Sequence, residues 1–202
     1  TSLGTSGKVM LAGGLGEAAQ TYEIWSPQLG GEYQDSLAES RWHHTATNLS
    51  ATDDGGSWSI AIAGGMFAHD GSSEIRSTME FVSSGSRNET GLIPLCPNAN
   101  SSDAPPSQMA LHQALHVQDA KLVLAVGGVT QIAPSAASSG SCLWFTEPSA
   151  WAGNSEVFAM IAPRARFAAA LAHGIDSECV LVAGGIGPGA EPESAGSAER
   201  FR

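Results

Sequence analysis

Histidine side chains are the first groups in this chain whose type and spacing suggest chemistry, because imidazole binds metals and transfers protons near neutral pH. His43 and His44 are neighbours, so on a strand their rings point to opposite faces and cannot hold one ion. His112 and His116 would share a strand face at a separation of about 13 Å, which is too far for a shared zinc ion. We therefore expect no metal site and no cofactor at these histidines.

The sequence also contains little that would support catalysis. It has no Cys-x-x-Cys pair for zinc, and no Gly-x-Ser-x-Gly elbow between a strand and a helix. A sugar-processing site would gather carboxylates and arginines, yet only Arg41, Arg164 and Arg166 are expected near the ends of inner strands. These observations favour a protein that is not an enzyme.

Three cysteines leave at least one thiol unpaired in any disulfide scheme. Cys179 lies in an apolar run, so we expect a buried free thiol there. Cys96 and Cys142 could form a disulfide if the compartment is oxidising, and the sequence leaves both states open. Three triplets fit the N-glycosylation pattern: Asn48-Leu49-Ser50, Asn88-Glu89-Thr90 and Asn100-Ser101-Ser102. Together with the acidic, lysine-poor composition, these triplets favour an extracytoplasmic location: secreted, periplasmic or in an organelle lumen.

The composition narrows the classes of partner. The 202 residues carry 9 Lys+Arg against 20 Asp+Glu, a formal net charge of −11 at pH 7. Nucleic acids and anionic membranes attract basic surfaces, so we expect neither a nucleic-acid partner nor direct membrane insertion. A chain of this length can bury one good core, which predicts a single domain over residues 1–202.

The elements that must position these side chains form an internal repeat. A short apolar run ending in two glycines occurs four times, and its first glycines are 51, 63 and 57 residues apart. Each run reads as a strand that is buried on both faces. Glycine at its end can adopt a positive φ and lets a neighbouring group approach closely. The glycine pairs are Gly13 and Gly14, Gly64 and Gly65, Gly127 and Gly128, and Gly184 and Gly185.

Two further strands accompany each apolar run. A second strand follows it after a polar loop, and three of the four copies contain a glutamate, namely Glu23, Glu80 and Glu199. Another strand precedes it in three copies, which we place at 41–49, 109–115 and 166–171. Short strands with polar turns, and no helical pattern of ten residues, predict an all-β protein.

In this combination the chain resembles the Kelch-repeat family, in the bacterial-style variant that reads Arg-x-x-His-x-Ala, an apolar strand with Gly-Gly, then Ser-x-Glu-x-Phe. The best copy has these elements at Arg41, His44, Ala46, Gly64, Gly65, Glu80 and Phe81. The copies depart from the pattern at Met109, Leu143 and Ala169. The resemblance covers Lys8 to Arg202 and implies a Kelch-type β-propeller with about four repeats visible.

The resemblance also implies that the ring is incomplete. If the strands of a blade run A to D from the inside outwards, we expect the chain to start at strand B and to stop at strand C. Members of the family usually need six or seven blades. We therefore expect part of a larger ring, or a ring that a partner completes, and a closed ring of four blades is the alternative.

The expected function is a non-catalytic protein-binding or scaffold module, with a protein partner or a larger complex. The alternative is a carbohydrate-binding or carbohydrate-active domain, oxidase- or epimerase-like, with a glycan ligand. Loops that follow each glycine pair, or precede each inner strand, would carry recognition. The candidate binding residues are Arg41, Trp42, Met66, Phe67, His69, Asp70, Arg164 and Arg166.

Overall fold

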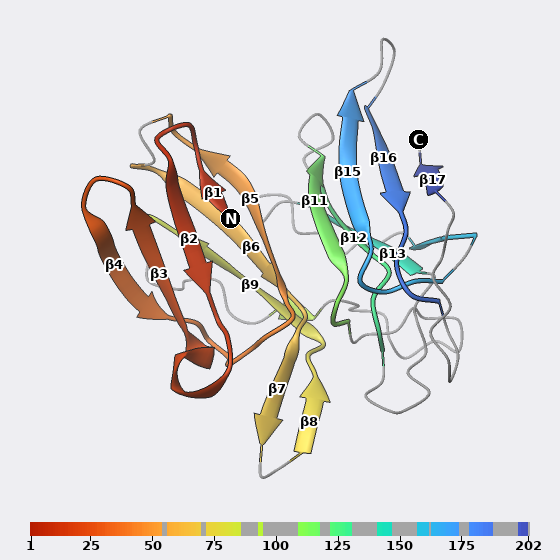
Figure 1. Ribbon diagram of the computed structural model, residues 1–202, viewed down its shortest axis with the longest axis horizontal. Coiled ribbons are helices and arrows are strands. Elements are labelled where there is room, and N and C mark those ends of the chain that lie inside the picture. Colours follow the sequence, from red (N-terminus) through yellow and green to blue (C-terminus); the bar gives the residue numbers. More distant parts are fainter. Residues whose placement is uncertain are drawn as a thin grey trace.

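The computed structural model is an all-β protein of short antiparallel strands, which confirms the predicted class (Figure 1). It describes residues 1–53, 56–69, 72–85, 93–94, 109–117, 122–130, 141–146, 157–161, 163–173, 178–187 and 198–201. Within these residues the strands form four consecutive sheets and one separate hairpin.

The first two sheets share a simple antiparallel meander. Sheet 1 contains β1 (Ser2–Leu3), β2 (Lys8–Ala12), β3 (Thr21–Ser26) and β4 (Gly30–Ser36). A short 3₁₀ helix, Gly16–Gln20, lies between β2 and β3. Sheet 2 contains β5 (Thr45–Ala51), β6 (Trp58–Ala63), β9 (Thr78–Ser83) and β10 (Ile93–Pro94). The hairpin of β7 (Met66–His69) and β8 (Ser72–Ile75) is inserted between β6 and β9.

The last two sheets repeat the same order. Sheet 3 contains β11 (Gln113–Val117), β12 (Leu122–Val126), β13 (Ser141–Thr146) and β14 (Val157–Ala159). Sheet 4 contains β15 (Ala168–His173), β16 (Glu178–Ala183) and β17 (Ala198–Phe201). In every sheet the apolar strand that ends in the glycine pair is a central strand, with a partner on each side.

Three features of the strands differ from the sequence-based expectation. Sheet 1 has a short inner strand, β1, where we expected the chain to start at strand B. The inner strands of the other sheets begin later than predicted, since Arg41 precedes β5 by four residues. The residues after Gly65 form the hairpin β7–β8, where we expected a loop.

In the described part of the chain, three apolar layers each lie between two successive sheets, and a fourth cluster, of Ile75, Ala110, Val129 and Ala165, lies beside the β7–β8 hairpin. Alternate residues of a central strand point to opposite faces. In β6, Ile60 and Ile62 therefore pack towards sheet 1, whereas Ala61 and Ala63 pack towards sheet 3. A third layer joins sheets 3 and 4. This double burial is the reason why the central strands are apolar at consecutive positions.

The four sheets do not close into a ring. β4 of sheet 1 and β17 of sheet 4 lie towards opposite ends of the long axis of the molecule (Figure 1). On the sides of these two sheets that face away from their neighbours, Leu11 is 56% exposed and Leu181 is 43% exposed. Sheets 1 and 4 therefore do not cover one another, and a closed four-blade ring is not formed.

The glycine pairs are the joints between the sheets. A Cβ atom on Gly64 would clash with the Met109 carbonyl oxygen and lie 2.9 Å from the His112 ring, both from the next sheet. A Cβ atom on Gly127 would lie 2.6 Å from the Arg164 carbonyl oxygen and from the Phe167 ring. Both glycines have φ near +60°, a conformation that disfavours every side chain. Position and conformation thus both require glycine.

We predict that Gly64→Ala and Gly127→Ala each lower the free energy of unfolding by about 2–5 kcal/mol. The cost combines the strained φ with the forced overlap against the next sheet. Gly16→Ala is the control, because Gly16 also has a positive φ but nothing lies within 4 Å of its Cβ position. Urea unfolding gives the free energy of unfolding of all three variants. An equal decrease in all of them would contradict the close-packing role of Gly64 and Gly127.

Candidate functional site

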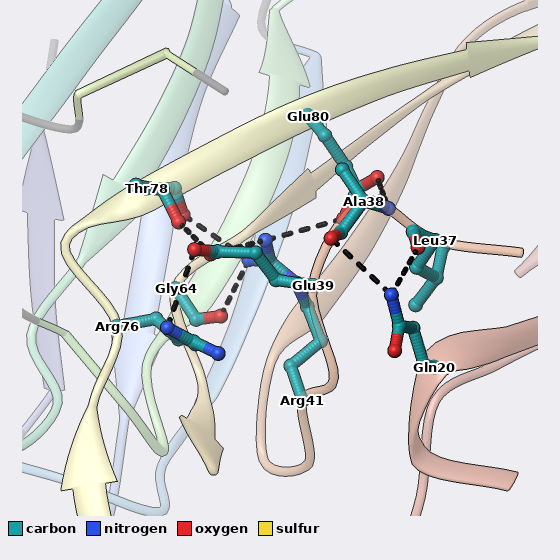
Figure 2. Close-up of polar contacts among 9 residues, drawn as sticks. All are labelled: Gln20, Leu37, Ala38, Glu39, Arg41, Gly64, Arg76, Thr78 and Glu80. Carbon is teal, nitrogen blue, oxygen red and sulfur yellow. Dashed lines mark hydrogen bonds and ion pairs between the residues drawn. The ribbon is translucent and has the colours of Figure 1, made fainter. Parts of the chain in front are cut away.

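A buried arginine lies at the centre of the polar network of sheet 2 (Figure 2). Arg41 is 0% exposed, and its Nη1 donates to the carbonyl oxygens of Gly64 at 2.8 Å and Thr78 at 3.1 Å. Its Nη2 lies 3.2 Å from Oε1 of Glu80 and 3.3 Å from Oε2 of Glu39. The guanidinium thus ties the segment before β5 to the end of β6 and to the start of β9.

Glu80 completes this network from the other side. The carboxylate is 1% exposed, and its Oε2 accepts a hydrogen bond of 2.7 Å from the backbone N–H of Ala38. Burial raises the pKa of Glu80, while the Ala38 N–H and the Arg41 charge act in the opposite direction. Burial lowers the pKa of Arg41, because it disfavours the charged form of this side chain as it does that of Glu80. The network therefore fixes the chain that crosses from sheet 1 to sheet 2.

Sheet 4 repeats the network with different residues. Arg164 is 0% exposed, and it donates from Nη1 to the Gly184 carbonyl oxygen at 3.1 Å and from Nη2 to Glu199 at 2.6 Å. Glu199 Oε2 accepts from the backbone N–H of Ile161 at 2.8 Å. Ile161 precedes Arg164 by three residues, as Ala38 precedes Arg41. The same four-part arrangement thus occurs twice, about 120 residues apart in sequence.

Sheet 3 replaces both charged partners at once. Met109, 0% exposed, precedes the inner strand where the other sheets have arginine. Leu143 pairs with Ala125, two residues before Gly127, and Glu80 pairs with Ile62, two residues before Gly64. Leu143 therefore occupies the register position of the glutamate. The two departures from the repeat therefore stand at the two positions that carry the buried arginine and glutamate in sheets 2 and 4.

We predict that Arg41→Met and Glu80→Leu each lower the free energy of unfolding by about 3–5 kcal/mol, because each leaves the other charge buried and unpaired. The double variant, which copies sheet 3, should recover a large part of that loss. Urea unfolding of the four proteins in a double-mutant cycle measures the coupling. Lys8→Met is the control, since its ion pair with Glu32 is partly exposed and should matter little. If the losses of unfolding free energy in the two single variants simply add in the double variant, Arg41 and Glu80 are not coupled and the prediction is wrong.

An aromatic ring from each sheet packs against the glycine joint of the sheet before it. The rings belong to His44, His112 and Phe167, and each follows the Arg41, Met109 or Arg164 position by three residues. Each ring lies against the first glycine of the preceding sheet, and its Cβ lies against the second glycine of its own sheet. The ring is thus held between two glycines from neighbouring sheets.

This register corrects one part of the sequence alignment. We aligned Arg166 with Arg41 and placed Ala169 at the histidine position, whereas the structure gives these places to Arg164 and Phe167. Arg166 has φ +53°, like His43 and Leu111 in the other sheets. These three residues connect the sheets, because Leu111 N donates to His43 O and Arg166 N donates to Leu111 O.

The two histidine rings are held neutral by their surroundings. Burial lowers the pKa of His44 to about 4, with the Arg41 charge acting in the same direction. Burial lowers the pKa of His112 to about 3, and the His112 ring is hydrogen-bonded through Nε2 to Thr45 Oγ1 at 3.0 Å. Since the unfolded chain has an ordinary histidine pKa near 6.5, the unfolded state takes up protons first as the pH falls.

We predict that the protein loses stability as the pH falls from about 6.5 towards 4. The folded pKa of each histidine lies below the unfolded one, so this contribution is complete above pH 6.5 and is lost on acidification, at up to about 1.4 kcal/mol per pH unit for each ring. His112→Phe, which copies Phe167, should flatten the slope of unfolding free energy against pH. The slope is compared between wild type and variant, and an unchanged slope would contradict the assignment.

Hairpin β7–β8 carries the candidate recognition residues of sheet 2. The guanidinium of Arg76 lies 3.5 Å from the centre of the Phe67 ring, a cation–π contact. Arg76 Nη1 also lies 3.2 Å from Glu39 Oε1, and Glu39 contacts Arg41 through its other oxygen. Trp42 and Met66 exchange two backbone hydrogen bonds, of 2.9 and 2.7 Å, at the base of the hairpin. The hairpin is therefore anchored to the buried network.

The other predicted binding residues divide into three groups. The prediction that Arg41 and Arg164 bind a partner at the surface is wrong, because both side chains are fully buried in ion pairs. Arg166 is exposed, at the end of the segment that leads into β15. His69 lies in β7, although its side chain is not described, and Asp70 lies outside the described residues. Sequence reasoning missed Glu39 and Arg76, for which no repeated motif gave a signal.

The remaining predicted residues are the cysteines and Glu23. Of the cysteines, Cys96 and the side chain of Cys142 lie outside the described part, so the predicted disulfide is not addressed. Cys179 is a free thiol, half-buried where we expected it buried. Glu23, although a glutamate of the repeat, is half-buried at the side of sheet 1 that faces away from sheet 2.

In the described part of the chain, no group of three or more His, Cys, Asp and Glu side chains could hold a metal ion. No helix among the described residues is long and apolar enough to cross a membrane. A scan against models of protein families gives no match, and a search of curated proteins gives none either.

Proposed function

We propose that this chain forms part of a Kelch-type β-propeller and acts as a non-catalytic protein-binding or scaffold module. The architecture is supported by meander sheets that pack face to face, each joined to the next by a glycine pair and an aromatic ring. Among the described residues, the buried Arg41, Glu80 and Arg164 all take part in ion pairs. The binding role rests on hairpin β7–β8, which projects beyond the sheets (Figure 1).

The hairpin has the properties of a protein-recognition element. A partner strand can add to the edge of a two-stranded ribbon and form backbone hydrogen bonds with it. An isolated ribbon is marginally stable, so the hairpin depends on its attachment through Trp42 and Arg76. Ile75 and Met66 also pack against the buried cluster of Ala110, Val129 and Ala165. Phe67 is half-buried under Arg76, a pairing of aromatic and arginine that is common in protein interfaces.

We predict that Phe67→Ala weakens binding of a protein partner by about 1 kcal/mol or more, a factor of about five in the dissociation constant. The partner is first captured on the wild-type chain and identified by a photoreactive side chain placed at position 67. Leu29→Ala, at an exposed apolar residue in the turn between β3 and β4, is the control. Melting temperatures of both variants should stay within error of wild type.

Two outcomes would overturn the proposal. A cross-link that forms equally from position 29 and position 67 would show that the hairpin is not the contact surface. A glycan array gives the other test, since saturable binding of one sugar, retained in Phe67→Ala, would support a carbohydrate-binding domain instead.

A further inference from the structure

The outer face of sheet 1, defined by Leu11, Glu23 and Trp25, exposes residues that the other sheets bury. Leu11 stands two residues before its glycine pair, and its counterparts Ile62 and Val182 are both 0% exposed. Leu11 itself is 56% exposed and Trp25 is 41% exposed. This face has the apolar residues of an internal layer, but none of the sheets in the described part of the chain covers it.

The outer face of sheet 4, defined by Leu181, Ala183 and Arg200, shows the complementary exposure. Leu181 stands three residues before its glycine pair, where Ala61 and Leu124 are each 1% exposed. Leu181 is 43% exposed. The joint on this side is also open, because nothing lies within 4 Å of the Cβ position of Gly184, while Gly127 is covered by Phe167.

These two faces correspond to the two sides of the apolar layers inside the chain. In the described layers, the side of one sheet that matches the outer face of sheet 4 packs against the next sheet. It meets that sheet on the side that matches the outer face of sheet 1. Ala61 and Ala63 of sheet 2 pack in this way against Val123 and Ala125 of sheet 3. Leu124 and Val126 of sheet 3 pack likewise against sheet 4. The molecule therefore exposes one unused copy of each half.

The charges on the two faces are also complementary. Arg200 pairs with Leu181 across the strands of sheet 4 and is exposed. Its counterparts in sheets 1 and 2 are the apolar residues Ile24 and Phe81. Glu23 pairs with Leu11 on the outer face of sheet 1. One face thus adds a cation beside Leu181, and the other an anion beside Leu11, which favours contact between these two faces.

We propose that two copies of this chain associate head to tail, with the outer face of sheet 4 of each copy against the outer face of sheet 1 of the other. The inference rests on the proposed propeller architecture and not on the role of the hairpin. Two such contacts, related by a two-fold axis, close a ring of eight sheets, which lies within the range of four to eight blades typical of propellers. Each copy supplies both halves of the interface.

The test measures the mass of the 202-residue chain by size exclusion with light scattering. We expect twice the chain mass of 20.7 kDa. Leu11→Glu and Leu181→Glu should each raise the dissociation constant at least tenfold, since each places a charge in both contacts of the dimer. In an equimolar mixture of the two variants, one contact of the mixed dimer has no substitution and the other has both. The mixture should therefore associate through the intact contact, more tightly than either variant alone and more weakly than wild type. Leu29→Glu is the control and should stay dimeric.

Three results would overturn the proposal. A monomer at the highest soluble concentration excludes the contact. Larger open polymers exclude a closed ring of two copies, because head-to-tail contacts that do not close continue as filaments. A mixture that associates no more tightly than either variant alone shows that the face of sheet 4 does not meet the face of sheet 1. Circular dichroism of each variant tests whether the fold tolerates glutamate at the exposed positions. If the dimer proposal fails, the proposed binding role of the hairpin is not affected.

Discussion

The contact between an aromatic ring and two glycines holds the sheets in sequence. The first glycine of one sheet leaves room for the ring of the next, and the second glycine of that next sheet leaves room for the Cβ atom of the same ring. A backbone hydrogen bond runs beside this contact, from Gly14 to Arg41, from Gly65 to Met109 and from Gly128 to Arg164. Because interiors pack at crystal density, one added methyl group at such a point must move backbone. The apolar layers between the sheets depend on this spacing.

The buried ion pairs have a different role from the glycine joints. Sheet 3 has the joint, with His112 against Gly64 and Gly128, but it has Met109 and Leu143 in place of the charged pair. The joint therefore forms without the pair. A buried pair costs desolvation and is weak evidence for net stability, whereas half a pair is strongly unfavourable. This asymmetry explains why arginine and glutamate are present together or absent together in sheets 2, 3 and 4.

The sequence predicted those features that depend on backbone geometry. Glycine pairs at a fixed place in a strand carry the repeat, because no other residue fits a positive φ at a close contact. The register of the fourth copy could not be predicted in the same way. The last position of the motif Arg-x-x-His requires a flat ring and not specifically a histidine. Because Phe167 fills this position in the fourth copy, the search for a histidine pattern aligned Arg166 with Arg41 in place of Arg164. Burial of the arginines was missed as well, because their partner Glu80 lies about 40 residues further along and Glu199 lies 35 residues further.

Glu39 links the buried network to the surface. One oxygen of its carboxylate contacts Arg41 and the Thr78 hydroxyl, and the other contacts Arg76, which stacks on Phe67. Glu39 thus holds the hairpin through Arg76, and the joint between sheets 1 and 2 sets the position of Glu39. A recognition element that is ordered before its partner arrives loses less conformational entropy on binding. The same interactions that stack the sheets therefore also orient the surface that we propose for binding.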